Sequence, residues 1–414
     1  MKRCFISAVR VVGKLLAAVL AVLAVFSVSP IYDFCDIGPF SGPDIFNPYS
    51  TLETPQWKKA NFHTHTRVKG PLNECELWPE DVLEDYRKLD YDILTFSNHN
   101  KLTKHPTDST LQVNVYEHGF NFLKYHKLVF GAEKVWHYDH LLPFLASQRQ
   151  WQLDMLDRQS DFQVLNHPYR TPGSTRRIMS RLDGYELIEL DSGAGDRQEY
   201  WDWALTAGHY SFAIANDDCH DSRNTRKIAR RATFIQTPSA GYKDLWHILT
   251  KVGCFYCMRI PDYGDGDWDV KREANRHLPF IEKVDVSGDT IDLVLSAPAL
   301  VLEARGAFRE RPSREEDDNI LKQEFDSAHI RYVLPSDEPY VRFTAYFGDG
   351  AILYTNAFAR YDASKQDNPF CPSHLEAHSI DIPLTIAYNL ALLIVFVLCL
   401  YVIFRRPKKR VIPA

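Results

Sequence analysis

The uncharged segment "LTIAYNLALLIVFVLCLYVIF", residues 384–404, constrains the fold of this chain more than any other feature. A helix of about 20 apolar residues is long enough to cross a bilayer, so this segment predicts a transmembrane helix. The basic run "RRPKKR" follows at once. By the positive-inside rule it predicts a cytoplasmic tail, residues 405–414, with the rest of the chain on the other side of the membrane.

The N-terminal residues 1–29 have the same character. Basic residues that include Arg10 and Lys14 precede the apolar run "LLAAVLAVLAVFSV", residues 15–28. This pattern is typical of a signal sequence or an uncleaved anchor. We favour the anchor because the small-residue cleavage pattern is poor and Pro30 would follow the cut. In both cases the body is exported, which predicts a protein of the cell membrane whose main part is extracytoplasmic, either periplasmic or extracellular.

The composition is typical of a packed globular body with membrane segments added: 45% of the 414 residues are hydrophobic and 13% are aromatic. The net charge of -6 and the pI near 6.2 give no general attraction to polyanions, so a nucleic-acid polymer is not favoured as a partner. Cys254 and Cys257 have CxxC spacing without a second such pair. That spacing alone is a weak zinc or redox motif, and we expect a structural bridge or two buried thiols.

The exported part divides into a linker, an α/β region and a β-rich region. Residues 30–56 contain five prolines and predict an irregular linker that lifts the body away from the bilayer. Residues 57–262 alternate short apolar runs with helix-like stretches such as "PEDVLEDYRKL", in which Pro79 begins the helix. This alternation predicts a parallel α/β barrel of the TIM type. The predicted strands are "ILTFS", "LVFGAE", "HLLPF", "FQVLN", "YELIEL", "FAIAN" and "ATFIQT".

Residues 275–362 have a different pattern. Apolar and polar residues alternate between Gly, Pro and Asp turns, and convincing helices are absent from the sequence. We therefore predict a small antiparallel β-sandwich with no catalytic pattern of its own.

Residues that bind metals follow or flank the predicted barrel strands. His63 and His65, in "NFHTHT", lie two apart, so both imidazoles lie on one side of an extended chain. The C-terminal ends of barrel strands form one face, so residues from six segments are expected to converge there as metal ligands. The candidate ligands are His63, His65, His99, Glu133, His140, His167, Asp218 and His220.

The order of these motifs resembles the PHP family, the polymerase and histidinol phosphatase domain. "HTHT" matches its opening HxH motif, and "SNHN" stands in place of TDH. Glu133 stands at its acidic bridge, "HLL" and "NHP" match its histidine motifs, and "DCH" matches its closing DxH, over about residues 57–260. The resemblance implies a distorted seven-stranded (βα)7 barrel with up to three divalent ions. It also implies a ligand set: His63, His65, Glu133 and Asp218 for one ion, Glu133, His140 and His167 for a second, and His99 and His220 for a third.

The sequence departs from the family at the third ion. An acidic or histidine ligand shortly after HxH is missing, and Asn98 replaces the Asp of TDH. We therefore expect two ions, with the ammonium of Lys69 as an electrostatic substitute for the third. The alternatives are that Lys69 faces solvent, or that Glu74 or Glu76 acts as a replacement ligand.

These features predict a metal-dependent hydrolase, most simply a phosphoesterase that uses a metal-bridging hydroxide. Imidazole and carboxylate ligands favour zinc, manganese or iron over magnesium. His99 or His220 is the candidate acid for the leaving group. Arg170, with Arg223 or Arg226, is a candidate to bind the phosphate.

Three further expectations concern the substrate of the phosphoesterase and the alternatives to that function. The exported location predicts a small-molecule phosphoester or a phosphorylated lipid or envelope component as the substrate. Hydrolysis of a carboxylic or carbamic ester at the same site is the alternative within enzymes. A metal-containing binding or sensory module without catalysis is the alternative outside them.

Overall fold

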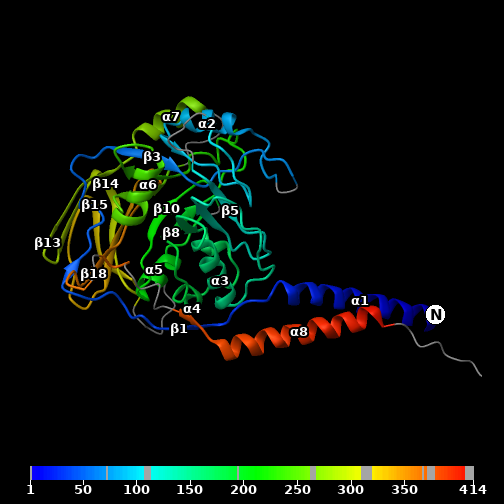
Figure 1. The fold of residues 1–414 in the computed structure, drawn as a ribbon. Helices are drawn as coiled ribbons and strands as arrows, with labels where there is room; N and C mark the ends of the chain where they lie inside the picture. Colours follow the sequence, from blue (N-terminus) through cyan, green and yellow to red (C-terminus); the bar gives the residue numbers. More distant parts are fainter. Residues whose placement is uncertain are drawn as a thin grey trace, which may run out of the picture.

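The computed structural model describes residues 2–70, 73–106, 113–193, 195–261, 267–308, 319–365, 368–370 and 378–405. These residues form a mixed α/β body from which two long helices project together (Figure 1). Two large sheets make up most of the body, and short helices cover their outer faces.

The first sheet supplies buried apolar residues to the core of the α/β region, among them Leu128, Val164 and Ile188. Its strand order is β10-β8-β7-β6-β5, and β9 pairs with β8. Strands β7, β8 and β10 are parallel, and their side chains are buried throughout, as expected for strands covered on both faces. The bounds are β5 Val115–His118, β6 Lys127–Phe130, β7 Phe162–Leu165, β8 Leu187–Ser192, β9 Gly195–Asp196 and β10 Phe212–Ala215.

Strand β6 runs against the direction of its neighbours. It pairs antiparallel with both β5 and β7. The start of β6 therefore lies at the same edge of the sheet as the ends of β5 and β7. The end of β6 lies at the opposite edge.

The second sheet joins the α/β region to the β-rich region. Its main order is β13-β14-β16-β17-β12-β11-β3-β4, with β15 beside β14 and with β18 and β2 attached to β16. All pairs in it are antiparallel except β3 with β4. The bounds are β2 Asp44–Ile45, β3 Trp57–Asn61, β4 Ile93–Leu94, β11 Arg231–Gln236, β12 Phe255–Arg259, β13 Ile281–Ser287, β14 Thr290–Arg305, β15 Ile320–Val333, β16 Tyr340–Tyr346, β17 Ile352–Thr355 and β18 Phe358–Tyr361.

The two sheets approach each other on both sides without closing into a TIM barrel. On the β5 side, a single bridge joins His99 to Glu117. On the β10 side, a single bridge joins Thr64 to Cys219, and the Thr233 hydroxyl accepts a hydrogen bond from the backbone of Ala215. The α/β character is as the sequence predicted. The expected closed barrel is not found, because isolated bridges and no continuous strand pairing join the two sheets in the described residues. The β-rich region is not a separate sandwich, because β12 pairs with β17 in one continuous sheet.

The helices of the body are short. In α2 (Pro79–Arg87) proline occupies the first turn, as predicted, and Val82, Leu83 and Tyr86 face the core. The predicted strand "HLLPF" is instead irregular chain that leads into α3. The other helices are α3 Ala146–Asp157, a 3₁₀ turn Pro168–Arg170, α4 Arg176–Met179, α5 Glu199–Thr206, α6 Tyr242–His247, a π-helical turn Ile248–Val252 and α7 Trp268–Arg276.

The segment predicted as a spacer, residues 30–56, is packed on the body. Its β1 (Tyr32–Phe34) pairs with β19 (His378–Ile380), and β2 pairs with β18. The hydroxyl of buried Tyr49 donates to the carbonyl of Phe255. These contacts hold the segment against the sheets, so it does not act as a loose spacer.

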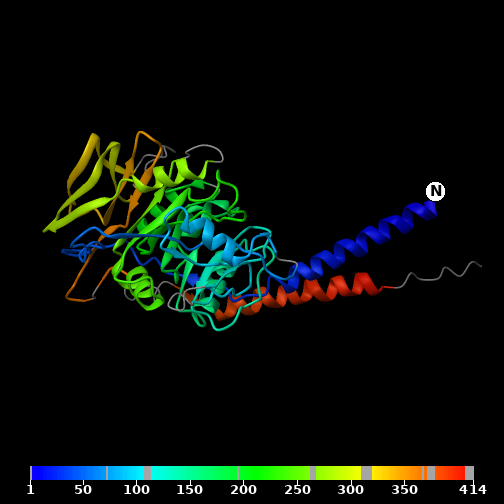
Figure 2. The same ribbon diagram turned by 90° about the horizontal axis from the view of Figure 1, so that it is seen from above.

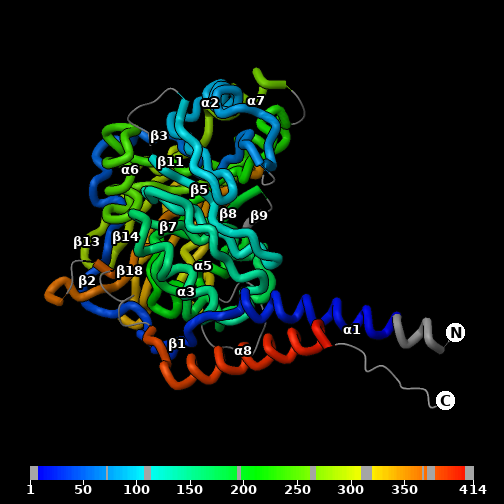
Figure 3. Tube along the Cα trace, turned by 45° about the vertical axis from the view of Figure 1, so that its right-hand side comes forward, coloured from blue at the N-terminus to red at the C-terminus, as the bar shows by residue number. Residues whose placement is uncertain are grey.

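Helices α1 (Lys2–Val25) and α8 (Ile382–Phe404) lie side by side and run in opposite directions (Figures 1 and 3). Both contain a stretch long and apolar enough to cross a membrane, Ala8–Val25 and Ile382–Phe404. Ala17, Ala21 and Cys399 pack between them. The start of α1 and the end of α8 lie at the same end of the pair, away from the body.

Six cysteines are free thiols: Cys35, Cys75, Cys219, Cys254, Cys257 and Cys399. Cys254 and Cys257 are buried, and burial raises the pKa of each. The buried-thiol interpretation of the CxxC spacing therefore holds for this pair.

A buried ion pair fastens helix α5 to strand β16. Arg342 donates from Nε to Asp202 at 2.7 Å and from Nη2 to Asp202 at 2.6 Å, and both side chains are almost fully buried. Burial opposes charge on Arg342, but the carboxylate of Asp202 raises the pKa of the guanidinium above its ordinary value. The pair thus links the α/β region to the β-rich region.

We predict that Arg342→Met destabilises the protein by about 3–5 kcal/mol, because it leaves the buried carboxylate of Asp202 without its counter-ion. Arg331, which is exposed on β15, serves as the matched control. Its replacement by Met should change stability by less than about 1 kcal/mol. Thermal unfolding of the full chain in detergent measures both variants, and equal midpoints would contradict the prediction.

Candidate metal centre

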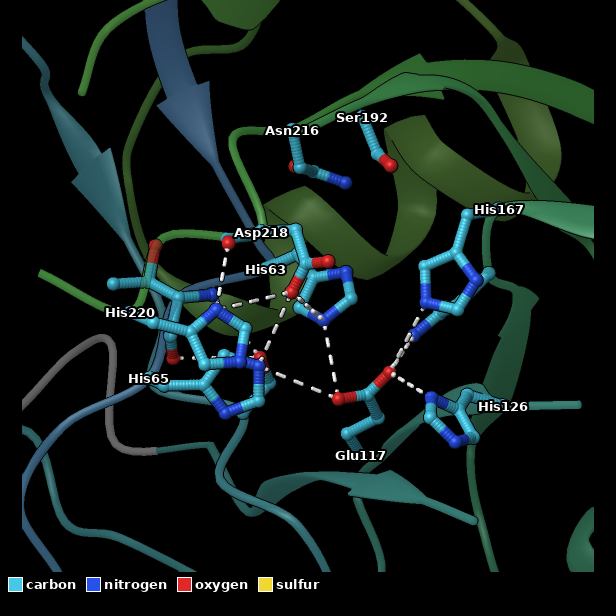
Figure 4. A network of polar contacts seen from close by, with 12 residues as sticks. His63, His65, Glu117, His126, His167, Ser192, Asn216, Asp218 and His220 are labelled. Atoms are coloured by element: carbon cyan, nitrogen blue, oxygen red, sulfur yellow. Dashed lines mark hydrogen bonds and ion pairs between the residues drawn. The ribbon is translucent and has the colours of Figure 1, made fainter. Parts of the chain in front are cut away.

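The candidate site lies at the edge of the body where β3, β4, β5 and β7 end and β6 begins. Imidazoles and carboxylates from these strand ends and from the loop after β10 point toward one another (Figure 4). The residues that the structure brings together there are His63, His65, Glu74, His99, Glu117, His126, His167, Asp218 and His220.

The carboxylate of Glu117 is the centre of this cluster. Its Oε2 lies 3.2 Å from Nε2 of His63, 3.3 Å from Nε2 of His65 and 3.2 Å from Nε2 of His99. Its other oxygen, Oε1, lies 3.0 Å from Nδ1 of His126 and 3.4 Å from Nε2 of His167. The two oxygens thus face two different groups of imidazoles, as a carboxylate that bridges two ions must.

The predicted bridging residue, Glu133, is not in this cluster. It is exposed and follows the end of β6. The prediction assumed that all strands are parallel, whereas β6 is antiparallel to its neighbours, so its end lies at the far edge. Glu117 occupies the expected place, in a strand "VYEH" that the sequence analysis did not identify.

His140 also lies outside the cluster, packed against the end of α1, and His126 takes its position. His140 is buried, and its Nδ1 lies 2.8 Å from the carbonyl oxygen of Phe26 at the end of α1. His126 immediately precedes β6, at the edge that faces the cluster. In the sequence, His126 and Lys127 come just before the apolar run "LVF" of β6. This position predicts a metal ligand only if β6 is known to run antiparallel to its neighbours.

The third group of ligands contains an acidic residue that the family pattern does not supply. The Oε2 atom of Glu74 lies 3.1 Å from Nε2 of His99 and 3.0 Å from Nε2 of His220. Lys69 is exposed, and its backbone carbonyl accepts from Lys101. Of the alternatives drawn from the sequence, the geometry therefore favours Glu74 as the replacement ligand over Lys69 as an electrostatic substitute.

The geometry of these atoms fits divalent ions. The Nε2 atoms of His63 and His65 are buried and have no aligned hydrogen bond, although carboxylate oxygens lie 3.2–3.4 Å away. Atoms that share an ion at about 2.1 Å lie roughly 3.0–3.4 Å apart. Buried polar atoms without partners are rare, and an ion between them would satisfy both.

Neighbouring residues orient the ligands. His63 Nδ1 lies 2.9 Å from Oε1 of Glu189, a contact that leaves Nε2 free to bind an ion. The backbone N–H of His167 donates to Oε2 of the same carboxylate at 3.1 Å. Asn166 donates to Oε1 of Glu117 at 3.0 Å.

The backbone at two candidate ligands is strained. His167 has a φ of 25° and Asp218 a φ of 50°, both in a region that residues other than glycine seldom occupy. Asp217 holds the strained turn, because its carboxylate accepts from the backbone N–H groups of Ala229, Arg230 and Arg231 at 2.7–2.9 Å. Strain of this kind persists where the surrounding structure fixes a functional side chain.

The cluster is strongly coupled by charge. Burial opposes the charged form of Glu117, but the surrounding imidazoles hold the pKa of its carboxyl well below its ordinary value. Burial likewise opposes protonation of His63, yet Glu117, Glu189 and Asp218 raise the pKa of its imidazole. The carboxylate of Glu117 is therefore charged, and the surrounding imidazoles compensate its charge. Bound cations would compensate the same charge.

A basic cleft of about 560 Å³ borders the cluster. Arg170 lies 2.5 Å from Asp218 and connects the two. Asp191 holds Arg231 at 2.7 Å and Arg259 at 2.8 Å. Arg223 is not among the lining residues and instead pairs with Asp221. The cationic residues that line the cleft are Arg170, Arg226, Lys227, Arg230, Arg231 and Arg259.

Comparison with known proteins gives limited similarity. No family model matches the chain, and no curated protein matches it. A solved two-domain protein from Bacteroides vulgatus, described as containing a predicted PHP-like metal-dependent phosphoesterase, is 15% identical, with 77% of this chain and 98% of that chain covered and a TM-score of 0.37.

Two other solved structures are similar over about half of the chain. PsfC from Pseudomonas syringae is 11% identical, covers 49% of this chain and 91% of its own, and has a TM-score of 0.34. The lesion-specific endonuclease PfuEndoQ from Pyrococcus furiosus is 12% identical, covers 48% of this chain and 57% of its own, and has a TM-score of 0.35. At such low similarity the site is defined by the geometry of this chain alone.

We predict that Glu117→Gln removes most of the bound metal, because the amide lacks the charge that both groups of imidazoles share. Mutation of residues that only orient a ligand costs roughly 10–100-fold in metal affinity, so loss of the bridging ligand should cost more. Metal content by elemental analysis of the purified full chain checks this. Glu133→Gln is the control and should retain the full content; the reverse result would restore Glu133 as the ligand.

A second prediction separates Glu74 from Lys69. Glu74→Gln should lower the number of ions bound per chain, because it removes the carboxylate between His99 and His220. Lys69→Met should leave that number unchanged, since Lys69 is exposed. Titration with Mn²⁺ followed by calorimetry counts the sites, and loss of binding in the Lys69 variant alone would contradict this assignment.

Proposed function

We propose that this protein is a metal-dependent phosphoesterase anchored in the cell membrane. The observation that carries the proposal is the position of the basic cleft beside the His/Glu/Asp cluster. Arginine donors match the oxygens of a phosphate group. A cleft with six cationic residues against two carboxylates, Asp217 and Asp218, therefore suits an anionic substrate whose phosphorus lies next to the metal ligands.

The ligands divide between two ions and a third position. His63, His65, Asp218 and Oε2 of Glu117 would hold one ion. His126, His167 and Oε1 of Glu117 would hold the second, and His99, His220 and Glu74 the third. Divalent ions in such a site polarise a phosphoryl oxygen and lower the pKa of bound water; the imidazole and carboxylate donors suit zinc, manganese or iron.

The side chains of the cleft position the substrate and move its proton. Arg170 lines the cleft and donates to the carboxylate of Asp218, so its guanidinium lies between the cluster and the cleft. Arg231 is fixed by Asp191, so it is preorganised to receive the phosphate oxygens. When the third position holds no ion, we assign proton transfer to the leaving oxygen to Nε2 of His220, which lines the cleft and whose Nδ1 is held by the carbonyl of Asp218.

Two alternatives remain distinct from this proposal. Hydrolysis of a carboxylic or carbamic ester would need no cationic cleft, and so the arginines favour a phosphate ester. A binding or sensory module without catalysis would not need a strained turn at Asp218 beside an open cleft. The low net charge still gives no support for a nucleic-acid polymer as substrate.

The anchoring part of the proposal rests on α1 and α8. Both are apolar over the length of a bilayer, and they run antiparallel. The sequence places basic residues at the start of α1 and after α8, which are at the same end of the pair. By the positive-inside rule that end is cytoplasmic, and the body lies on the extracytoplasmic side.

We predict that the full chain, purified in detergent with Mn²⁺ or Zn²⁺, hydrolyses p-nitrophenyl phosphate or bis(p-nitrophenyl) phosphate. Arg226→Gln should raise the KM for the phosphoester at least about tenfold, because a hydrogen bond to a charged group contributes roughly 1.5–3 kcal/mol. Hydrolysis of p-nitrophenyl acetate should be slower and insensitive to this change.

Two controls accompany this measurement. Arg223→Gln, outside the cleft, should leave the KM for the phosphoester unchanged. His63→Ala should abolish the metal-dependent activity. Cleavage of the carboxylic ester alone would establish the alternative hydrolase, and absence of all cleavage with metal bound would establish the binding module.

A further inference from the structure

Four large apolar side chains are exposed on two loops at one end of the body. Phe120 and Phe122 lie in the loop between β5 and β6 and are 63% and 75% exposed. Phe144 and Leu145, just before α3, are 60% and 40% exposed. We call these four residues the aromatic loop surface. Large apolar side chains exposed together on neighbouring loops are typical of a binding surface, whereas singly scattered ones are not.

The two loops form one unit. The backbone N–H of Phe122 donates to the carbonyl of Leu141 at 3.0 Å. The carboxylate of Asp139 accepts from the backbone of Phe120 at 2.6 Å and from the side chain of Asn121 at 2.9 Å. The phenylalanines are therefore presented outward by a hydrogen-bonded framework.

This unit is attached to the end of helix α1. The imidazole of His140 contacts the carbonyl of Phe26, and the hydroxyl of Tyr138 donates to the carbonyl of Val28 at 3.4 Å. The rings of Phe26 and Tyr138 stack with centroids 6.2 Å apart. In Figure 2 the cyan and teal loops of this region lie at the end of the body from which the helix pair projects. The aromatic loop surface is thus close to the end of the apolar span of α1, residues 8–25.

A groove at the same junction has the composition of a membrane interface. It has a volume of about 560 Å³ and is lined by Val25, Val28, Pro30, Tyr138, Trp151 and Ile380 together with three polar residues, Ser29, Thr385 and Asn389. Tyrosine and tryptophan concentrate at the boundary between hydrocarbon and water, because one part of each ring system is apolar and another is polar. The groove is therefore continuous with both the helix pair and the body.

We propose that the aromatic loop surface docks on the same bilayer that α1 and α8 cross, with its phenylalanines in the interfacial layer. The inference rests on the anchoring in the proposed function and extends it. Continuity with the helix pair selects the bilayer as the occupant. Lys124, exposed on the same loop, adds a cation that suits anionic headgroups.

The docking surface is directly connected to the metal centre. The loop that carries Phe120 and Phe122 begins after Glu117 and His118 and ends at His126. Insertion of this loop brings the edge of the centre that contains Glu117 and His126 toward the headgroup layer. The chemical class of substrate that this arrangement suits is a phosphate ester carried by a bilayer lipid.

Photo-crosslinking of the full chain in lipid nanodiscs tests the docking. p-Benzoyl-phenylalanine is placed at one of three positions, and the discs contain phosphatidylcholine and phosphatidylglycerol. Phe122 is the test position. Phe325, 64% exposed on β15 at the other end of the body, is the matched control. Leu393, 54% exposed in the middle of α8, reports whether the helix is in the membrane.

We expect phospholipid adducts at positions 122 and 393, detected by mass spectrometry, with a yield at 122 several-fold above that at 325. Adducts at 393 without excess at 122 would overturn the docking and leave the anchoring intact. Absence of adducts at both positions would overturn the anchoring and the docking together. Crosslinks from 122 to a second protein chain in place of lipid would overturn the docking in favour of self-association. The readout needs no enzymatic activity, so failure of the proposed phosphoesterase reaction is recorded separately.

Discussion

The carboxylate of Glu117 is the interaction on which the rest of the site depends. Its two oxygens lie within 3.0–3.4 Å of five imidazoles that come from four separate strand ends, those of β3, β4, β6 and β7. A buried carboxylate without compensating charge would be costly. The body therefore has to hold these histidines at fixed positions, and Glu189 and Asn166 provide that support through directed hydrogen bonds.

The β5–β6 hairpin connects the two proposals. The last residues of β5 include Glu117, His126 immediately precedes β6, and the loop between them carries Phe120 and Phe122. Backbone hydrogen bonds between β5 and β6 fix the position of the loop relative to the two strands. The same short segment therefore determines both the geometry of the metal centre and the surface that we propose faces the bilayer.

Much of the candidate site could be predicted because its residues follow strands in the expected way. His63, His65, His99, His167, Asp218 and His220 all converge at one edge of the body. Glu133 and His140 do not, because β6 is antiparallel and the "HLLPF" segment is irregular. Strand direction depends on pairing with distant segments, and a single sequence carries little information about it. Glu74 was only one of several alternatives, since its loop is placed by tertiary contacts.

The sequence by itself determined the chemistry available to this protein: imidazoles and carboxylates in repeated positions after apolar strands, and two apolar segments long enough to cross a membrane. These features are local, because they depend on residue type and on spacing along the chain. Only the tertiary structure decided which carboxylate lies at the centre, which arginines line the cleft, and that the β-rich segment continues the sheet of the α/β region. Each of these depends on contacts between residues far apart in the chain, where pairing direction and packing, rather than local pattern, set the geometry.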